Sequence, residues 1–117
     1  MKFRGTTVTF VKRSDDLLVG YRASGHSGYA QAGEDIVCAG ISALTQSTLN
    51  GLQNVLKAPV KFDIDDRTAS LEAELAPEAS EAQVEAAQLL FQTLLQGLQA
   101  IERSYPRNLR IFFEERR

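Results

Sequence analysis

Residues 60–75 read VKFDIDDRTASLEAEL, and this stretch decides the fold. Apolar residues alternate with charged residues over positions 60–65, and the two-residue period returns over positions 69–75. Such alternation is typical of strands with one buried face. The triplet Asp65-Asp66-Arg67 stands between the two runs, and aspartate favours turns. The sequence therefore predicts a β-hairpin and an antiparallel sheet around it.

Three further strands are predicted outside the hairpin. Residues 3–12 are rich in Thr, Val and Phe, which are common in strands, and residues 14–16 favour a turn. The next strand has one apolar face, made of Leu17, Val19, Tyr21 and Ala23. Near the end of the chain a last strand alternates in the same way, with Leu109, Ile111 and Phe113 on one face.

Two stretches have the three-and-four spacing of amphipathic helices. The first begins near Asp35, a plausible N-cap, and ends before Pro59; its apolar stripe is Val37, Ile41, Leu44, Leu52 and Val55. The second begins at Ser80, which has capping-box spacing to Gln83, and ends before Pro106. Its stripe is Val84, Ala87, Phe91, Leu94, Leu98, Ile101 and Tyr105. Between the second strand and the first helix, residues 24–33 are predicted to form a glycine-containing loop.

This order of elements, ββαββαβ, predicts an α+β fold with a mostly antiparallel sheet and two helices packed on one face. A chain of 117 residues has the size of a single domain, which we assign to residues 1–117. The second helix keeps its spacing for three heptads. That pattern fits a helix packed on the sheet, the commoner case, or a helix paired across a dimer.

Composition narrows the classes of function. A chain with 44% hydrophobic and 24% charged residues is expected to be globular, and a pI near 5.4 argues against direct binding of nucleic acid. We expect no membrane partner, because no apolar run has the length of a span or of a secretory signal. The single cysteine forms no internal disulfide and is consistent with the cytoplasm.

No metal or cofactor is expected. One histidine and one cysteine are too few for a structural zinc site. A carboxylate site at Asp65 and Asp66 is possible, but a turn is the commoner role of such a triplet.

The only histidine and the only cysteine, His26 and Cys38, are twelve positions apart in GHSGYAQAGEDIVCAGIS. If Asp35 caps the helix, Cys38 is its third residue, where free N–H groups and the helix dipole favour a thiolate. A turn of about 100° per residue places Cys38 at the edge of the apolar stripe, where the sulfur can reach solvent. A cysteine nucleophile with an imidazole base is one interpretation. A small buried cysteine and an unrelated surface histidine are the other.

The same stretch resembles the signature of the ribosomal-processing cysteine proteases, the Prp family. That family shows a Gly-His pair, a variable loop, Gly-x-Asp with two aliphatic residues and Cys, and a Ser four positions later. Those residues here are Gly25, His26, Gly33, Asp35, Ile36, Val37, Cys38 and Ser42. Gly40 departs from the pattern, because alanine is more frequent at that place.

The resemblance implies a cytoplasmic bacterial endopeptidase, often a homodimer, which removes a short N-terminal extension from the twenty-seventh protein of the large ribosomal subunit. It implies that Cys38 is the nucleophile and that His26 is the base and later the acid. Asp35 and Ser42 occupy supporting positions, as do Gly25 and Gly33. Asp35 either orients His26 or caps the helix.

Two other functions remain open from the residues. A non-catalytic ribosome-associated module would use the loop as a docking surface, and a thiol redox sensor would need a resolving cysteine that this chain lacks.

A row of acidic residues, Asp63, Asp65, Glu72 and Glu74, is expected on the outer face of the hairpin, where Lys61 partly offsets their charge. Solvation is the ordinary role of such a row, and steering of a basic protein is the alternative.

Overall fold

The elements follow the predicted order in the computed structural model, which describes residues 3, 5–25 and 32–116 and, for residues 32–35, the backbone alone. Their bounds are β1 Thr6–Lys12, β2 Leu18–Ser24, α1 Ala32–Asn50, the π-helical turn η1 Gly51–Val55, β3 Val60–Asp65, β4 Ser70–Leu75, α2 Glu81–Ser104 and β5 Leu109–Glu115. The predicted α+β class and order are confirmed.

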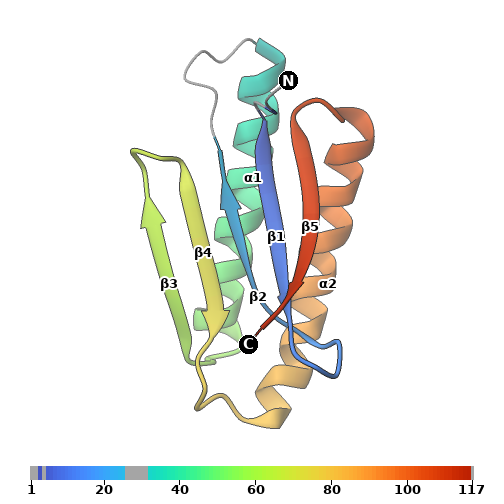
Figure 1. Ribbon diagram of the computed structural model, residues 1–117. Coiled ribbons are helices and arrows are strands. Elements are labelled where there is room, and N and C mark those ends of the chain that lie inside the picture. Colours follow the sequence, from blue (N-terminus) through green and yellow to red (C-terminus); the bar gives the residue numbers. More distant parts are fainter. Residues whose placement is uncertain (1–2, 4, 26–31, 117) are drawn as a thin grey trace.

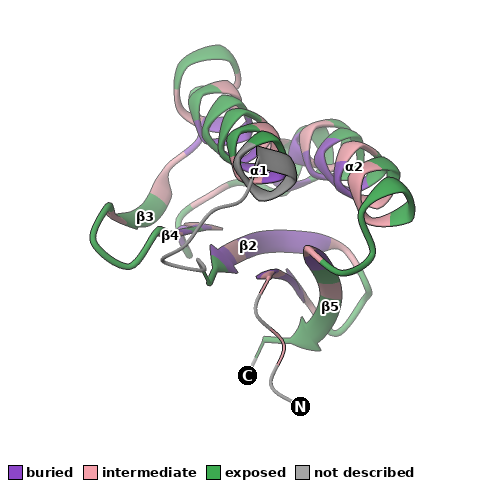
Figure 2. Cartoon of the chain, turned by 90° about the horizontal axis from the view of Figure 1, so that it is seen from above, coloured by how far each residue is buried: buried purple, intermediate pink, exposed green. Residues whose placement is uncertain are grey.

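The strands form one sheet in the order β3-β4-β2-β1-β5 (Figure 1). All neighbours are antiparallel except β1 and β5, which are parallel. Both helices lie on the same face of the sheet (Figure 2). Within the described residues, neither helix is long and apolar enough to cross a membrane.

The core lies between this face and the helices. Val8, Phe10, Val19 and Tyr21 come from the central strands β1 and β2 and are at most 1% exposed. The Tyr21 hydroxyl donates a 2.7 Å hydrogen bond to the Thr45 carbonyl of α1. Burial raises the pKa of Tyr21, so this phenol stays a donor.

The predicted second helix is confirmed at its start and along its stripe. Ser80 accepts a hydrogen bond from the Gln83 N–H, and the Gln83 side chain accepts one from the Ser80 N–H, so the capping box is complete. The apolar stripe is buried from Val84 to Leu98. Tyr105 is the exception, because it follows the last helical residue and is 39% exposed. This stripe therefore packs against the sheet, which is the commoner of the two roles predicted for it.

The predicted start of the first strand and the predicted end of the first helix are wrong. The first strand begins at Thr6 and not at Phe3, because its pairing with β5 starts at Thr6 and Leu109, where the Thr6 N–H donates a 2.9 Å hydrogen bond to the Asn108 carbonyl. The first helix does not continue regularly to Pro59. It passes into η1, where the Leu56 N–H bonds the Gly51 carbonyl, and this wider turn rotates Val55 outward to 81% exposure.

Tyr21→Phe is expected to lower the free energy of unfolding by about 1–2 kcal/mol, because the buried Thr45 carbonyl loses its donor. Urea unfolding followed by circular dichroism measures the change. Tyr105→Phe, on an exposed residue, is the control and should change stability by less than about 0.5 kcal/mol. Equal effects of the two substitutions would contradict the role given to the Tyr21 hydroxyl.

Gly40→Ala is expected to raise the free energy of unfolding by about 0.5–1 kcal/mol, since alanine is the better helix former. A Cβ at Gly40 would lie 3.4 Å from Ile101 Cδ1, an ordinary contact. Gly97→Ala provides the comparison, because its Cβ would lie 3.0 Å from Leu44 Cδ1 and force that side chain to move. Thermal unfolding should show the larger gain for Gly40→Ala.

Candidate functional site

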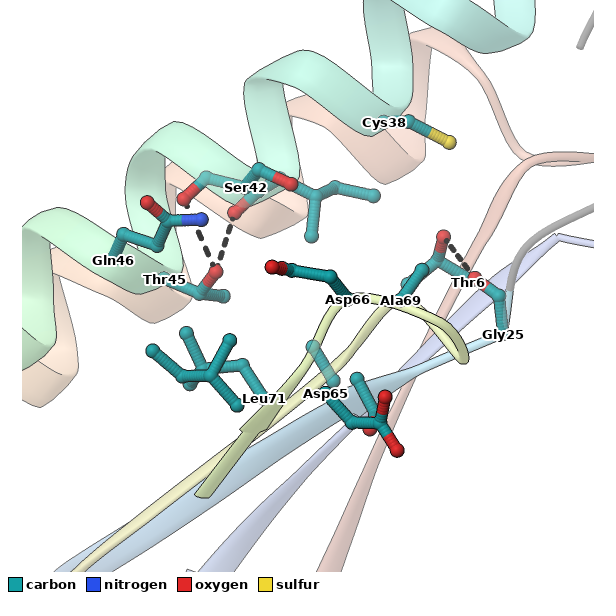
Figure 3. A pocket seen from close by; sticks show the side chains of 14 residues that line it. Thr6, Gly25, Cys38, Ser42, Thr45, Gln46, Asp65, Asp66, Ala69 and Leu71 are labelled. Carbon is teal, nitrogen blue, oxygen red and sulfur yellow. Dashed lines mark hydrogen bonds between the residues drawn. The ribbon is translucent and has the colours of Figure 1, made fainter. Parts of the chain in front are cut away.

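Cys38 lies at the edge of the buried face of α1. Val37 and Ile41 point into the core and are 2% and 4% exposed, whereas the cysteine is partly exposed. The predicted place of Cys38 beside the apolar stripe is therefore confirmed. Ser42 and Gln46 follow Cys38 at four-residue steps along the same side of the helix (Figure 3).

The cysteine opens into a pocket of about 90 Å³. Facing α1 are the tip of the β3–β4 hairpin, with Asp66 and Ala69, and the strand ends at Thr6 and Gly25 (Figure 3). Pockets for drug-sized ligands are several times larger. This one has room for a single side chain beside the sulfur.

Gly25 has a backbone reason to be glycine. Its φ is +102°, which side-chain-bearing residues rarely adopt, and a Cβ there would lie 2.7 Å from the Gly5 carbonyl oxygen. The Thr6 hydroxyl donates a 3.1 Å hydrogen bond to the Gly25 carbonyl. These contacts fix the end of β2 immediately before the predicted histidine.

His26 lies outside the described residues, as does the side chain of Asp35. The backbone nevertheless corrects two predictions. Helix α1 begins at Ala32, so Gly33 belongs to its first turn and not to the loop, and Asp35 is inside the helix and is not its N-cap. Glycine weakens a helix without stopping it, whereas Ala32 and Glu34 on either side favour one.

Because α1 starts earlier than predicted, Cys38 lies further from the N-terminus of the helix. Cys38 is the seventh residue of the helix and not the third. The influence of a helix dipole falls off within the first turn, and only the first four N–H groups lack a partner inside the helix. The Cys38 N–H is therefore engaged within α1, and the predicted effect of the helix N-terminus on the sulfur does not apply.

Sequence reasoning did not place Thr6, Gln46 and Asp66 beside the cysteine, although all three line the pocket. They come from β1, α1 and the hairpin tip, which only the tertiary fold brings together. The helical four-residue step from Ser42 is the one signal in the sequence that points to Gln46. The Asp65-Asp66-Arg67 triplet indicates a turn and not a wall of this pocket, and no local pattern marks Thr6.

The turn interpretation of Asp65-Asp66-Arg67 is supported by geometry. Asp65 Oδ1 accepts a 2.9 Å hydrogen bond from the Arg67 N–H, as in an Asx turn. Among the described residues, no group of three or more His, Cys, Asp or Glu side chains is placed to hold a metal ion.

A protein-family model described as "Cysteine protease Prp" matches residues 6–110. This chain belongs to the Prp family. The chain is thus a cysteine protease of the ribosomal-processing family.

Similar proteins agree in sequence and in structure. The "Ribosomal processing cysteine protease Prp" of Bacillus subtilis is 28% identical over 102 residues, which cover 86% of this chain and 91% of the relative. The protein of the same name from Staphylococcus aureus is 30% identical over 90 residues, covering 77% of this chain and 81% of the relative.

Two crystal structures of the Staphylococcus aureus Prp protease superpose on this fold. The complex with a substrate peptide has a TM-score of 0.80 at 26% identity, and the complex with a covalently linked product peptide has 0.78 at 27%. Each comparison covers 93% of this chain and 99% of the other.

The predicted acidic row is more neutral than the sequence indicated. Arg116 forms a 3.0 Å ion pair with Glu74, and Arg22 lies opposite Glu72 in the register of β2 and β4. The pKa of Arg22 is raised, first by its hydrogen bonds to Glu114 and further by the charges of Glu72 and Glu74. These two arginines offset the negative charge by which Glu72 and Glu74 would steer a basic protein toward the enzyme.

Gly25→Ala is expected to reduce proteolysis by this Prp chain at least about ten-fold, because it strains the backbone that leads to residue 26. Initial rates on a peptide substrate measure the effect, with circular dichroism as the folding control. Ser24→Ala, on the exposed neighbour, should leave the rate within about two-fold of the original protein. Full activity of folded Gly25→Ala would contradict the role assigned to this glycine.

Proposed function

We propose that this Prp-family protease removes a short N-terminal extension from the twenty-seventh protein of the large ribosomal subunit, with Cys38 as nucleophile and His26 as proton acceptor and donor. The observation that carries the proposal is the partly open sulfur in a pocket that ends at Gly25, the residue before His26. The relatives' names supply the ribosomal-processing role.

The reaction begins when His26 takes the thiol proton and the Cys38 sulfur attacks the scissile carbonyl carbon. The resulting tetrahedral intermediate collapses as its C–N bond breaks, and His26 returns the proton to the leaving amine. In the second half of the reaction His26 takes a proton from a water molecule, whose oxygen attacks the thioester carbonyl carbon. The C–S bond then breaks, the carboxylic acid product leaves, and His26 returns this second proton to the Cys38 sulfur.

Stabilisation of the oxyanion falls to groups other than the Cys38 N–H. That N–H is engaged inside α1, as its place in the helix requires. Ser42 is one turn further along and lines the same pocket. We assign the Ser42 hydroxyl a supporting role beside the reacting carbonyl, where such a donor stabilises developing charge. Asp35 remains a candidate to orient His26.

Cys38→Ala is expected to abolish cleavage of a synthetic peptide that spans the processed junction, since no other cysteine is present. His26→Ala should lower kcat by about 10²- to 10⁴-fold, the usual contribution of general acid–base catalysis. Ser42→Ala should have a smaller effect than either. Mass spectrometry identifies the cut, and rapid alkylation of Cys38 by iodoacetamide at neutral pH, slowed in His26→Ala, tests the pairing.

A non-catalytic ribosome-associated module is the competing function. It predicts that the peptide binds to wild-type protein and is recovered intact, and that Cys38→Ala binds no differently. Homodimer formation and a cytoplasmic location remain part of the proposal through the family resemblance. Analytical ultracentrifugation tests the first, and cell fractionation tests the second.

A further inference from the structure

Strand β3 has an apolar side that the helices leave partly uncovered. Phe62 and Ile64 pair with Ala73 and Leu71 of β4, and opposite residues of an antiparallel pair share one face of the sheet. The two β4 residues are 2% and 6% exposed, whereas Phe62 is 50% exposed and Ile64 is 44% exposed. Figure 2 shows β3 extending beyond α1 at the edge of the sheet.

The backbone of the same residues faces away from β4. The Ala76 N–H donates to the Pro59 carbonyl at 2.9 Å, so residues 59 and 76 form a hydrogen-bonded pair. Bonded and non-bonded pairs alternate along antiparallel strands. The pairs of Phe62 with Ala73 and of Ile64 with Leu71 are therefore non-bonded. The N–H and C=O groups of Phe62 and Ile64 point to the free edge, because β3 is the outermost strand.

This edge is continuous with the catalytic pocket. Ile64 lines the pocket together with Cys38, and the hairpin tip that follows Asp65 forms its facing wall. The pocket reaches from β3 to the end of β2, and a strand added outside β3 would lie three strand spacings, or about 14 Å, from the end of β2. About four extended residues cover that distance.

The opposite side of β3 is charged. Lys61, Asp63 and Asp65 lie on the outer face, where the two aspartates outnumber the lysine. If a second copy of β3 paired antiparallel to the first with residue 64 opposite residue 64, Asp63 of each copy would lie opposite Asp65 of the other. The like charges would repel each other. A basic partner strand has no such conflict.

We propose that the free edge of β3 binds an extended segment of the substrate polypeptide as an added strand. Apolar side chains at every second position pack over Phe62 and Ile64 beside α1, and basic or uncharged residues between them lie next to Asp63 and Asp65. The paired segment is separated from the scissile bond by about four residues. This inference rests on the proposed proteolytic function and names how that site selects its substrate.

The first test changes the apolar side of β3. The double substitution Phe62→Thr and Ile64→Thr keeps β-forming residues and removes apolar area. We expect KM for the junction peptide to rise about ten-fold or more. Because Ile64 also lines the pocket with Cys38, Phe62→Thr alone is the variant expected to raise KM with kcat within about two-fold. Phe112→Thr on β5 is the matched control, because Phe112 is 49% exposed but lies at the other edge of the sheet. An unchanged KM in the folded double variant would overturn the proposal.

The second test leaves the protein unchanged. Junction peptides are N-methylated at one residue at a time, which removes one backbone donor. An added strand predicts that alternate methylations, in the segment about four residues from the scissile bond, raise KM and that those between them do not. Effects without a two-residue period would contradict strand addition.

The outcomes distinguish failure of the proposed proteolytic function from failure of the strand-addition site on β3. If wild-type protein does not cleave the peptide, the proposed function fails. If it cleaves and neither test shows the predicted change, only the strand-addition site fails. If the β3 substitutions change the sedimentation coefficient instead of KM, a second copy occupies the edge and the substrate does not.

Discussion

The rotation of α1 about its own axis is the constraint on which the site depends. Val37 and Ile41 are buried against the sheet, and the Tyr21 hydroxyl holds the Thr45 carbonyl two turns beyond Cys38. A helix fixed at these points has no freedom to turn. Because neighbouring residues are about 100° apart, Cys38 must open to the side, toward the hairpin tip and the strand ends. The core thus sets the direction of the sulfur.

The parts that the sequence predicted correctly are those with a local physical cause. Alternation over residues 60–75 produced the hairpin, and the reciprocal bonds of Ser80 and Gln83 began α2 where expected. The place of Cys38 at the edge of its stripe followed from helical geometry alone. Gly25 differs from these, because the sequence marked it only through the family resemblance, and its positive φ now supplies a physical reason for glycine at this place.

The errors occurred where tertiary packing or a weak local preference decided. The start of α1 was placed at Asp35 because aspartate is a good cap, yet the helix continues back through Gly33 to Ala32. Val55 was assigned to the buried stripe because a regular helix was assumed, and η1 changed its phase. The pocket residues Thr6 and Asp66 could not be found, because strands distant in sequence bring them to the cysteine.

The open edge at β3 follows from the dimensions of the layers. A helix with its side chains is about 10 Å wide, and strands are about 4.8 Å apart, so two helices side by side cover roughly four strands. A sheet of five strands therefore exceeds its helical cover by one. The pairing of β1 with β5 extends the sheet on the side of α2, and β3 lies beyond α1 on the other side (Figure 1). Cys38 lies on that same open side, so one mismatch of widths provides both access to the sulfur and an uncovered apolar face of β3 beside it.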